Sequence, residues 1–463
     1  MTRKMSVLAS LYIALSLTSI LFSQIPVNAA VISYGVFSGI ILLSVLFVSP
    51  APVVQKLKDE KLEWLTSQGL KTYATPNIKD YVTKESDIKK ITKAYETNNL
   101  ARVNEIVKQY ENGSEYLRRK MIPLTSNTLT THEKTFNGRF AKDIDNVFYD
   151  EDPTSSMLVY KSWNYDKLLI DINKIYRKNV IDDAERDLIV SECSKWSKIN
   201  KDRPEYLKET EELIKLRKLA GDIAYRKKDM NIILNHNLSY LLQTQVVSKN
   251  SFMLTRKFPP GRIIILSATP DIDTIKKIAS LSGKTVRVFK QDKQVKRVGK
   301  INQVLINSSK NKIKDNVEKI KELNDAEVTI THKSMVGTYN SNSDNIPYGG
   351  NVMGYNSLKG KNISIAYTLQ AKPEYYKMKY CLLHEDKAPL DKTEYAKVTW
   401  HKSRFLFYSA ANDKLRNIIM QHIDSEMVQA IERARTLTED CTVTVFSNFI
   451  CSIVDPVNVK LIA

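Results

Sequence analysis

Asn146-Val147-Phe148-Tyr149 is followed directly by Asp150-Glu151-Asp152, and Arg262-Ile263-Ile264-Ile265-Leu266 is followed directly by Ser267-Ala268-Thr269. Each stretch is a short apolar run that ends in polar side chains. Such runs are typical of buried strands in parallel sheets, whose ligands bind at the carboxyl ends of the strands. The two stretches therefore predict an α/β fold with a functional site at one sheet edge.

Further strand-like stretches alternate with longer helical ones along the chain. Such alternation predicts parallel sheets with helices on both faces. The count suits two sheets of about five strands, in domains at 55–270 and 271–463 with the boundary soon after Pro270. The further predicted strands are Lys71–Thr75, Met121–Thr131, Thr285–Phe289, Gln303–Ile306, Glu327–Thr331, Ile363–Tyr367 and Thr442–Phe446.

Residues 155 to about 255 interrupt this alternation with charged, helical sequence. Pro204 stands where a helix is expected to open, since proline is favoured in the first turn. We interpret the segment as a helical insertion in the first domain. Its basic side chains either grip nucleic acid or form a solvated helix face; they are Lys215, Arg217, Lys218, Arg226, Lys227 and Lys228.

The N-terminal segment, residues 1–54, carries no charge between Met5 and Gln55. Two apolar runs, Met5–Phe22 and Ala29–Val48, flank a short polar break, and the second has about the ~20 residues that a spanning helix needs. Basic residues at both ends predict a transmembrane hairpin over residues 5–48 that leaves the remainder on the cytoplasmic face of a membrane.

Two alternatives stay open for this segment. Met1–Ala29 also fits a signal peptide, with a basic start and a small-residue cleavage site. Leu43–Val48 also fits the first strand of the first sheet, followed by a loop at Ser49-Pro50-Ala51-Pro52. In that case the protein is cytoplasmic and soluble.

Composition points to a polyanionic partner. The chain has 463 residues, 43% of them hydrophobic, with a formal net charge of +19 and a pI near 9.4. A charge surplus of this size favours nucleic acid first and an anionic membrane surface second. The four cysteines form no Cys-x-x-Cys pair, which argues against a zinc site or a disulfide framework.

The order of the acidic triplet, the Ser267-Ala268-Thr269 turn and a late Gln429-Ala430-Ile431-Glu432-Arg433-Ala434-Arg435 stretch resembles the superfamily 2 helicases of the DExH/D-box kind. The resemblance covers most of residues 70–450 and is nearest to helicases of phages, plasmids and mobile elements. It implies two RecA-like domains, ATP and Mg²⁺ as cofactors, and nucleic acid as partner, with DNA favoured over RNA.

The resemblance also implies roles for individual residues. Asp150 would hold Mg²⁺, Glu151 would orient the attacking water, and Arg433 would act as an arginine finger. Nucleotide-binding or coupling residues would be Ser267, Thr269, Gly354, Asn356, Gln429 and Arg435. Nucleic-acid-binding residues would be Thr75, Pro76, Thr131, His132 and Ser357.

Two departures from the family pattern bear on activity. The stretch from Ser49 to Lys56, where a glycine-rich phosphate loop is expected, contains two prolines and no glycine. In the late motif, Glu432 replaces a glycine and Thr436 replaces the second arginine. The sequence therefore leaves three hypotheses: an ATP-driven helicase, a hydrolysis-deficient nucleic-acid-binding protein tethered to a membrane, or a truncated helicase fragment.

Overall fold

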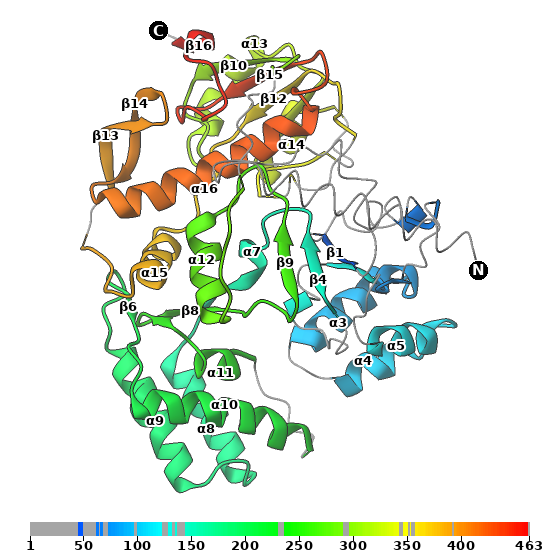
Figure 1. The fold of residues 1–463 in the computed structure, drawn as a ribbon, viewed down its shortest axis with the longest axis vertical. Coiled ribbons are helices and arrows are strands. Elements are labelled where there is room, and N and C mark those ends of the chain that lie inside the picture. Colours follow the sequence, from blue (N-terminus) through cyan, green and yellow to red (C-terminus); the bar gives the residue numbers. More distant parts are fainter. Residues whose placement is uncertain are drawn as a thin grey trace, which may run out of the picture.

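The structure is a computed structural model. It describes residues 45–49, 62–63, 65–67, 73–96, 100–122, 128–131, 135–136, 144–229, 236–289, 296–341, 346–350, 352, 357–390 and 393–461 of the chain. Within these ranges lie two five-stranded sheets, a four-stranded sheet and a two-stranded hairpin. Figure 1 shows both five-stranded sheets accompanied by helices, as the alternating sequence pattern predicts.

The first sheet is parallel throughout and has the strand order β2-β3-β1-β4-β9. Because all of its strands are parallel, their carboxyl ends lie at one edge of the sheet. Gly261 precedes β9 with a φ of 81°, and a Cβ there would lie 2.6 Å from the carbonyl oxygen of Ile144, so only glycine fits beside β4. The strands are β1 (Val45–Ser49), β2 (Tyr73–Ala74), β3 (Thr128–Thr131), β4 (Asn146–Tyr149) and β9 (Arg262–Ile265).

Strand β1 corrects the prediction of a second membrane span. Val45–Val48 lie between β3 and β4 in the sheet, so a helix over the whole of Ala29–Val48 is wrong at its end, and the strand alternative holds there. A strand covered on both faces is as continuously apolar as a membrane segment, which explains the ambiguity. No helix in the described part of the chain is both long and apolar enough to cross a membrane. Residues 1–44, with the first run and the signal-peptide alternative, lie outside the described residues.

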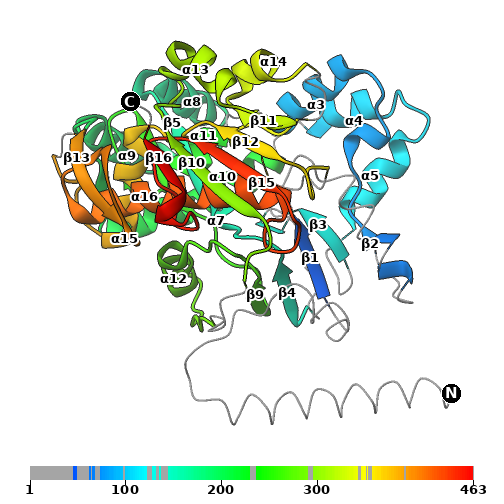
Figure 2. The ribbon, with the colours of Figure 1, turned by 90° about the horizontal axis from the view of Figure 1, so that it is seen from above.

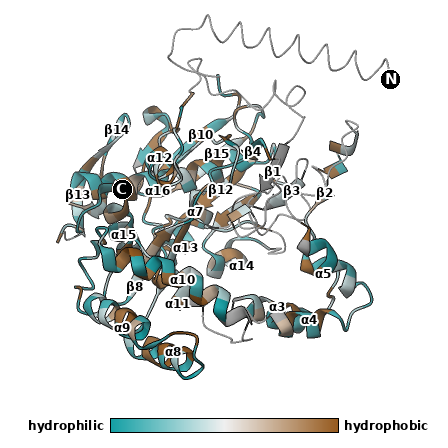
Figure 3. Cartoon of the chain, turned by 60° about the horizontal axis from the view of Figure 1, so that its bottom comes forward, coloured by the Kyte–Doolittle hydropathy of each residue, from teal (hydrophilic) through white to brown (hydrophobic). Residues whose placement is uncertain are grey.

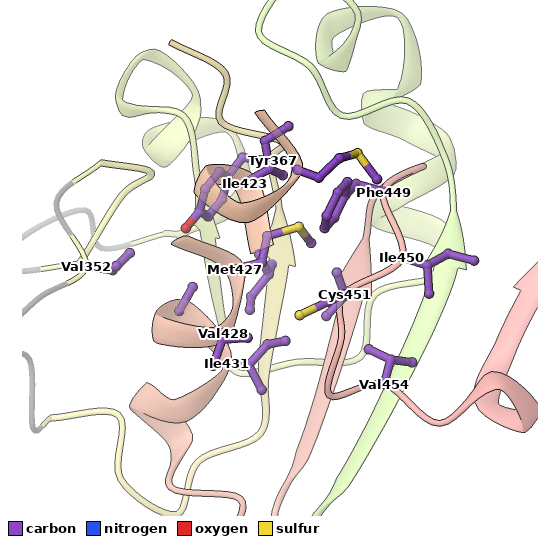
Figure 4. Close-up of a cluster of buried hydrophobic side chains, with 14 of the residues drawn as sticks. Val352, Tyr367, Ile423, Met427, Val428, Ile431, Phe449, Ile450, Cys451 and Val454 are labelled. Carbon is purple, nitrogen blue, oxygen red and sulfur yellow. The ribbon is translucent and has the colours of Figure 1, made fainter. Parts of the chain in front are cut away.

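The second sheet is also parallel, with the order β11-β12-β15-β10-β16. Its core is shared with the long helix α16 (Asp413–Ile431), which buries Ile423, Met427 and Ile431 beside Tyr367 and Phe449 (Figure 4). Apolar burial of this kind supplies most of the stability of such a unit. The strands are β10 (Lys300–Leu305), β11 (Val328–Thr331), β12 (Ile363–Ala366), β15 (Thr442–Phe446) and β16 (Val459–Leu461).

The insertion is helical, as predicted, but an antiparallel sheet ordered β5-β8-β7-β6 supports it. Figure 3 shows its helices with hydrophilic and hydrophobic faces, and the apolar faces form one buried cluster. The helices are α8 (Tyr165–Arg177), α9 (Asp183–Ser197), α10 (Glu211–Asp229) and α11 (His236–Leu241), and the strands are β5 (Leu158–Ser162), β6 (Glu205–Tyr206), β7 (Val246–Val247) and β8 (Ser251–Thr255).

The predicted helix start at Pro204 is wrong. Pro204 leads into strand β6, and α10 begins at Glu211, where the Thr210 hydroxyl accepts a hydrogen bond from the Leu213 amide. The basic residues of the insertion are partly engaged within it: Arg217 pairs with Glu209 at 3.0 Å and Arg226 with Glu185 at 2.8 Å.

The first helix after the predicted domain boundary at Pro270 still packs on the first sheet. This helix, α12 (Ile272–Leu281), buries Ile275 and Ile278 in one cluster with Val147 and Tyr149 of β4. α15 (Pro373–His384) joins that cluster, although it follows β12 in the chain. The predicted strand Thr285–Phe289 is wrong: these residues lie in no helix or strand, and the Phe289 side chain is 63% exposed.

The remaining elements flank the two sheets. Figures 1 and 2 both place α3, α4 and α5 at one end of the molecule and the hairpin at the other. The flanking helices are α3 (Glu85–Glu96), α4 (Leu100–Val107), α5 (Gly113–Met121), α7 (Thr154–Met157), α13 (Val317–Glu322) and α14 (Val336–Tyr339), and the hairpin strands are β13 (Thr393–Trp400) and β14 (Ser403–Ala410).

Candidate functional site

The carboxylates of the acidic triplet have different surroundings at the carboxyl edge of the first sheet. Asp152 is buried, and its two carboxylate oxygens accept hydrogen bonds from the amides of Thr154 at 2.8 Å and Asp271 at 2.5 Å. Burial raises the pKa of Asp152, and these amides oppose that shift. Asp152 therefore ties the α7 turn to the start of α12 through backbone amides.

Glu151 meets Arg433, which comes from the far end of the chain. The Arg433 Nη2 atom lies 3.4 Å from the Glu151 Oε1 atom, with 11% of the arginine side chain and 25% of the glutamate side chain exposed. Arg433 sits in the single turn Glu432–Ala434 that continues α16. The structure thus joins an acidic residue of the first sheet edge to an arginine carried by α16. Below, the first unit is the first sheet with the elements packed on it, and the second unit is the second sheet with α16 and the hairpin.

The Thr269 turn contacts the same face of α16. Ser425, Gln429 and Arg433 are spaced four residues apart, so they lie above one another on one side of the helix. The Ser425 hydroxyl donates to the Thr269 hydroxyl at 2.9 Å, and the Gln429 side-chain amide donates to it at 3.4 Å. Within the turn, the Thr269 amide donates to the Ser267 hydroxyl at 3.2 Å. Of the predicted nucleotide-binding or coupling residues, Thr269 and Gln429 are thus in contact, and Ser267 adjoins Thr269.

Buried acceptor atoms surround the contact. Neither the Glu426 Oε2 atom nor the Gln429 Oε1 atom has a hydrogen-bond partner among the described residues. Burial raises the pKa of Glu426, the Gly350 amide lowers it, and the nearby charge of Glu151 raises it further. Buried acceptors without donors are unfavourable. The site therefore favours a donor or a cation placed between the two units.

Arg435 does not join this group. Its backbone is left-handed, with a φ of 61°, and its side chain is exposed. The two departures from the family motif instead contact each other: Arg297 donates to Glu432 at 2.5 Å and to the Thr436 hydroxyl, and that hydroxyl donates to Glu432 at 3.2 Å. Arg297 thus brings a guanidinium to the place where the motif lacks its second arginine.

The predicted nucleic-acid residues are only partly placed. The Thr75 and Thr130 hydroxyls lie 3.1 Å apart and are buried, so the Thr75 hydroxyl links β2 to β3 below the surface. Pro76 follows Thr75, and Thr131 ends β3 opposite Ser49 of β1.

Three other predicted residues lie outside the described residues, namely Gly354, Asn356 and His132. Ser357 is described and exposed. No contact therefore tests the roles assigned to these four residues.

Sequence reasoning missed Ser425 and Glu426 on α16. It also missed a hydroxyl network at the carboxyl edge of the second sheet, where the Thr368 hydroxyl lies 3.1 Å from that of Ser308 and 2.7 Å from that of Ser447. His332 contacts the Ser308 carbonyl oxygen at 3.0 Å beside it. The only available signal was the position of each residue just after a predicted strand or on one helix face.

The residues fit the cofactors implied by the resemblance only in part. Mg²⁺ binds through one or two carboxylates together with phosphate oxygens, and Asp150 can supply one such carboxylate. No group of three or more His, Cys, Asp or Glu side chains that could hold a metal occurs in the described ranges. Residues 50–56, which follow β1, lie outside the described residues; their sequence has no glycine, and its two prolines lack amide donors for a phosphate.

Comparisons with known proteins find matches among solved structures alone. No protein-family model matches the chain, and no curated protein does. The chain is similar to a structure titled XPD helicase, with a TM-score of 0.39 and 12% identity over 88% of each chain. It is also similar to a truncated XPD, with a TM-score of 0.29 and 14% identity over 55% of this chain and 89% of the other.

Proposed function

We propose that the chain is a superfamily 2 helicase-like protein that binds a nucleoside triphosphate with Mg²⁺ between its two parallel-sheet units and acts on nucleic acid. The observation that carries the proposal is the 3.4 Å contact between Glu151 and Arg433. These residues lie far apart in the sequence and come from different units. Their meeting at a sheet edge is the arrangement that the family resemblance requires.

The two groups suit chemistry at a phosphate. A carboxylate can orient water or accept its proton, and a guanidinium can stabilise negative charge that develops opposite. ATP, when bound, supplies the phosphoanhydride whose cleavage releases energy. Glu151 and Arg433 would face it together from the sheet edge at which they meet.

The Thr269 contacts support coupling between the units. Thr269 belongs to the turn after β9, whereas Ser425 and Gln429 belong to α16. Any movement of α16 relative to the first sheet would change these hydrogen bonds. The turn is therefore suited to linking the state of the Glu151–Arg433 site to the relative position of the units.

One observation favours a second candidate, a nucleic-acid-binding protein that does not hydrolyse nucleotide. Strand β1 ends at Ser49 between β3 and β4, so the following residues start at the edge where a phosphate loop is needed. Their sequence, Pro50-Ala51-Pro52-Val53-Val54, offers few amide donors and no glycine. Each missing donor at a charged transition state reduces the rate by about 10²–10³-fold.

An assay of nucleotide binding and hydrolysis tests the proposal. We expect the full chain to bind Mg²⁺-ATP in equilibrium dialysis and to hydrolyse it faster with single-stranded DNA or RNA. Glu151→Gln should reduce turnover by about 10²–10⁴-fold, as loss of a general base does. The matched control, Glu318→Gln, changes a side chain that is 89% exposed and should have no effect.

The assay separates the two candidates. Binding of ATP without turnover would support the non-hydrolysing candidate. Absence of ATP binding, or turnover unchanged by Glu151→Gln, would refute the proposed site.

A further inference from the structure

The hairpin β13–β14 has one face in the core and one in solvent. Its strands pair in full antiparallel register, from Thr393 opposite Ala410 to Trp400 opposite Ser403. The inner face buries Val398, Phe405 and Phe407, and both phenylalanines contact the ring of Phe449. This inner packing holds the hairpin against the second unit and accounts for only half of its side chains.

The outer face is unusually aromatic for a solvated surface. Tyr395 and Tyr408 are directly paired, with ring centroids 5.3 Å apart, and their exposures are 56% and 42%. Leu406 lies beside them and is 57% exposed. The Thr393 hydroxyl donates to the Tyr408 hydroxyl at 2.9 Å, which fixes one ring from its edge and leaves ring surface open. No neighbouring element covers these side chains in the described part of the chain.

The charge on this face is entirely positive. Lys397 pairs with Leu406, and Arg404 pairs with Thr399, so both cations stand on the same face as the tyrosines. Glu394 pairs with Ser409 and therefore belongs to the opposite face. The outer face thus has two tyrosines bordered by two cations and no carboxylate.

We propose that this outer face, made by Tyr395, Lys397, Arg404, Leu406 and Tyr408, binds single-stranded nucleic acid. The exposed rings offer stacking surfaces for bases, and the two cations offer contacts for phosphates. A duplex would not fit, because its base faces are stacked internally. The two cations, with no carboxylate on the face, favour a polyanion over a protein partner. The net charge of +19 favours the same class of partner.

The site lies on the second unit and does not include the Glu151–Arg433 contact. It rests on the nucleic-acid part of the proposed function, which both candidate functions share, and not on nucleotide hydrolysis. Binding can therefore be measured without ATP, and a failed hydrolysis assay leaves this proposal standing.

Fluorescence anisotropy of a labelled 20-nucleotide oligo-dT with the full chain measures the effect of the rings. Tyr395→Ala/Tyr408→Ala should weaken binding by roughly 5- to 150-fold for each stacked base that is lost. Tyr395→Phe/Tyr408→Phe keeps both rings and should retain binding. Phe289→Ala removes another exposed ring, outside any helix or strand, and serves as the matched control.

The salt dependence measures the effect of the cations. Lys397→Ala/Arg404→Ala should lower the slope of log K against log [salt] by about 1.4, since each single-strand phosphate contact contributes about 0.7. Thermal melting of each variant shows whether the fold is kept. Loss of binding in the phenylalanine pair as severe as in the alanine pair would contradict stacking.

Photo-crosslinking locates the contact directly. Oligo-dT carrying 5-iodouracil should crosslink to the peptides that contain Tyr395 and Tyr408. Crosslinks confined to other segments, together with unchanged affinity of the alanine pair, would overturn the proposal. That outcome would leave the exposed face of the hairpin without a nucleic-acid contact.

Discussion

At the scale of single residues, neighbouring carboxylates of the acidic triplet have different partners. Asp152 is committed to backbone amides, whereas Glu151 faces a guanidinium from the second unit. The charge of Glu151 also acts on the buried Glu426. Arg433 therefore pairs with an acidic group whose charge reaches a second one, and its own charge matters for folding as well as for any chemistry.

Replacing this arginine should lower stability. Arg433→Ala removes the guanidinium that pairs with the largely buried Glu151, which should reduce the free energy of unfolding by about 1–3 kcal/mol. Arg435→Ala, the matched control, removes an exposed side chain and should change it by less than about 0.5 kcal/mol. Urea unfolding of both variants measures the difference. Equal losses would show that the Glu151–Arg433 contact contributes nothing specific.

His422 should make the protein less stable in mild acid. Burial, together with the charge of Lys379, lowers the pKa of His422 to about 4. The ring centroids of His422 and Tyr376 lie 5.5 Å apart. The unfolded chain, with a histidine pKa of about 6.5, binds more protons between these values. Stability contributed by neutral His422 is therefore complete above about pH 6.5 and declines as the pH falls toward 4, by up to about 3 kcal/mol.

Urea unfolding between pH 4.5 and 7 measures this effect. His422→Gln removes the titrating group, so the variant should lose less stability over this range than the wild type. Parallel pH profiles for the two proteins would show that other groups cause the acid sensitivity.

At the scale of elements, local pattern predicted buried parallel strands better than exposed or antiparallel ones. Asn146–Tyr149 and Thr442–Phe446 have the predicted bounds, because both are buried parallel strands with continuous apolar sequence. Thr285–Phe289 has the same β-rich composition but pairs with no described strand, so propensity alone was insufficient. The hairpin β13–β14 was missed, since its alternating face is interrupted by exposed tyrosine and leucine side chains that resemble core residues.

Asp271 joins α12 to α15, and its removal should lower the free energy of unfolding. It caps α12 by accepting from the Thr274 amide at 3.2 Å, and it pairs with Lys379 of α15, whose side chain is only 7% exposed. Asp271→Ala leaves that ammonium buried without its partner and should destabilise by about 3–5 kcal/mol. Asp182→Ala removes the exposed cap of α9 alone and should destabilise by about 0.5–2 kcal/mol. Similar losses in thermal or urea unfolding would mean that Lys379 does not depend on Asp271.

At the scale of the whole molecule, the sequence predicted several residues of the candidate site but not the contacts between them. The acidic triplet, Thr269, Gln429 and Arg433 were predictable because each follows a strand or lies in a recognisable motif. Ser425, Glu426 and the pairing of Arg297 with Glu432 were not. Ser425 reaches Thr269 only when the two units meet, and Arg297 reaches Glu432 only when segments far apart in the sequence fold together in the second unit. The exposed position of Arg435 was equally hidden, since the left-handed turn that displaces it has no glycine to mark it.

The place of β1 decides whether the apolar N-terminal sequence belongs to a sheet or to a membrane. Its backbone is paired on both sides, with Val45–Val48 opposite β4 and Phe47–Ser49 opposite β3. Amides in a central strand exchange with solvent only when the sheet opens. Hydrogen exchange of the full chain in lipid-free buffer should therefore protect residues 45–49 as strongly as Asn146–Tyr149. Residues 285–289, which lie in no element, supply the unprotected control. Fast exchange at 45–49 beside a protected β4, with protection gained only on adding lipid vesicles, would place this segment in the membrane and leave the first sheet without its central strand.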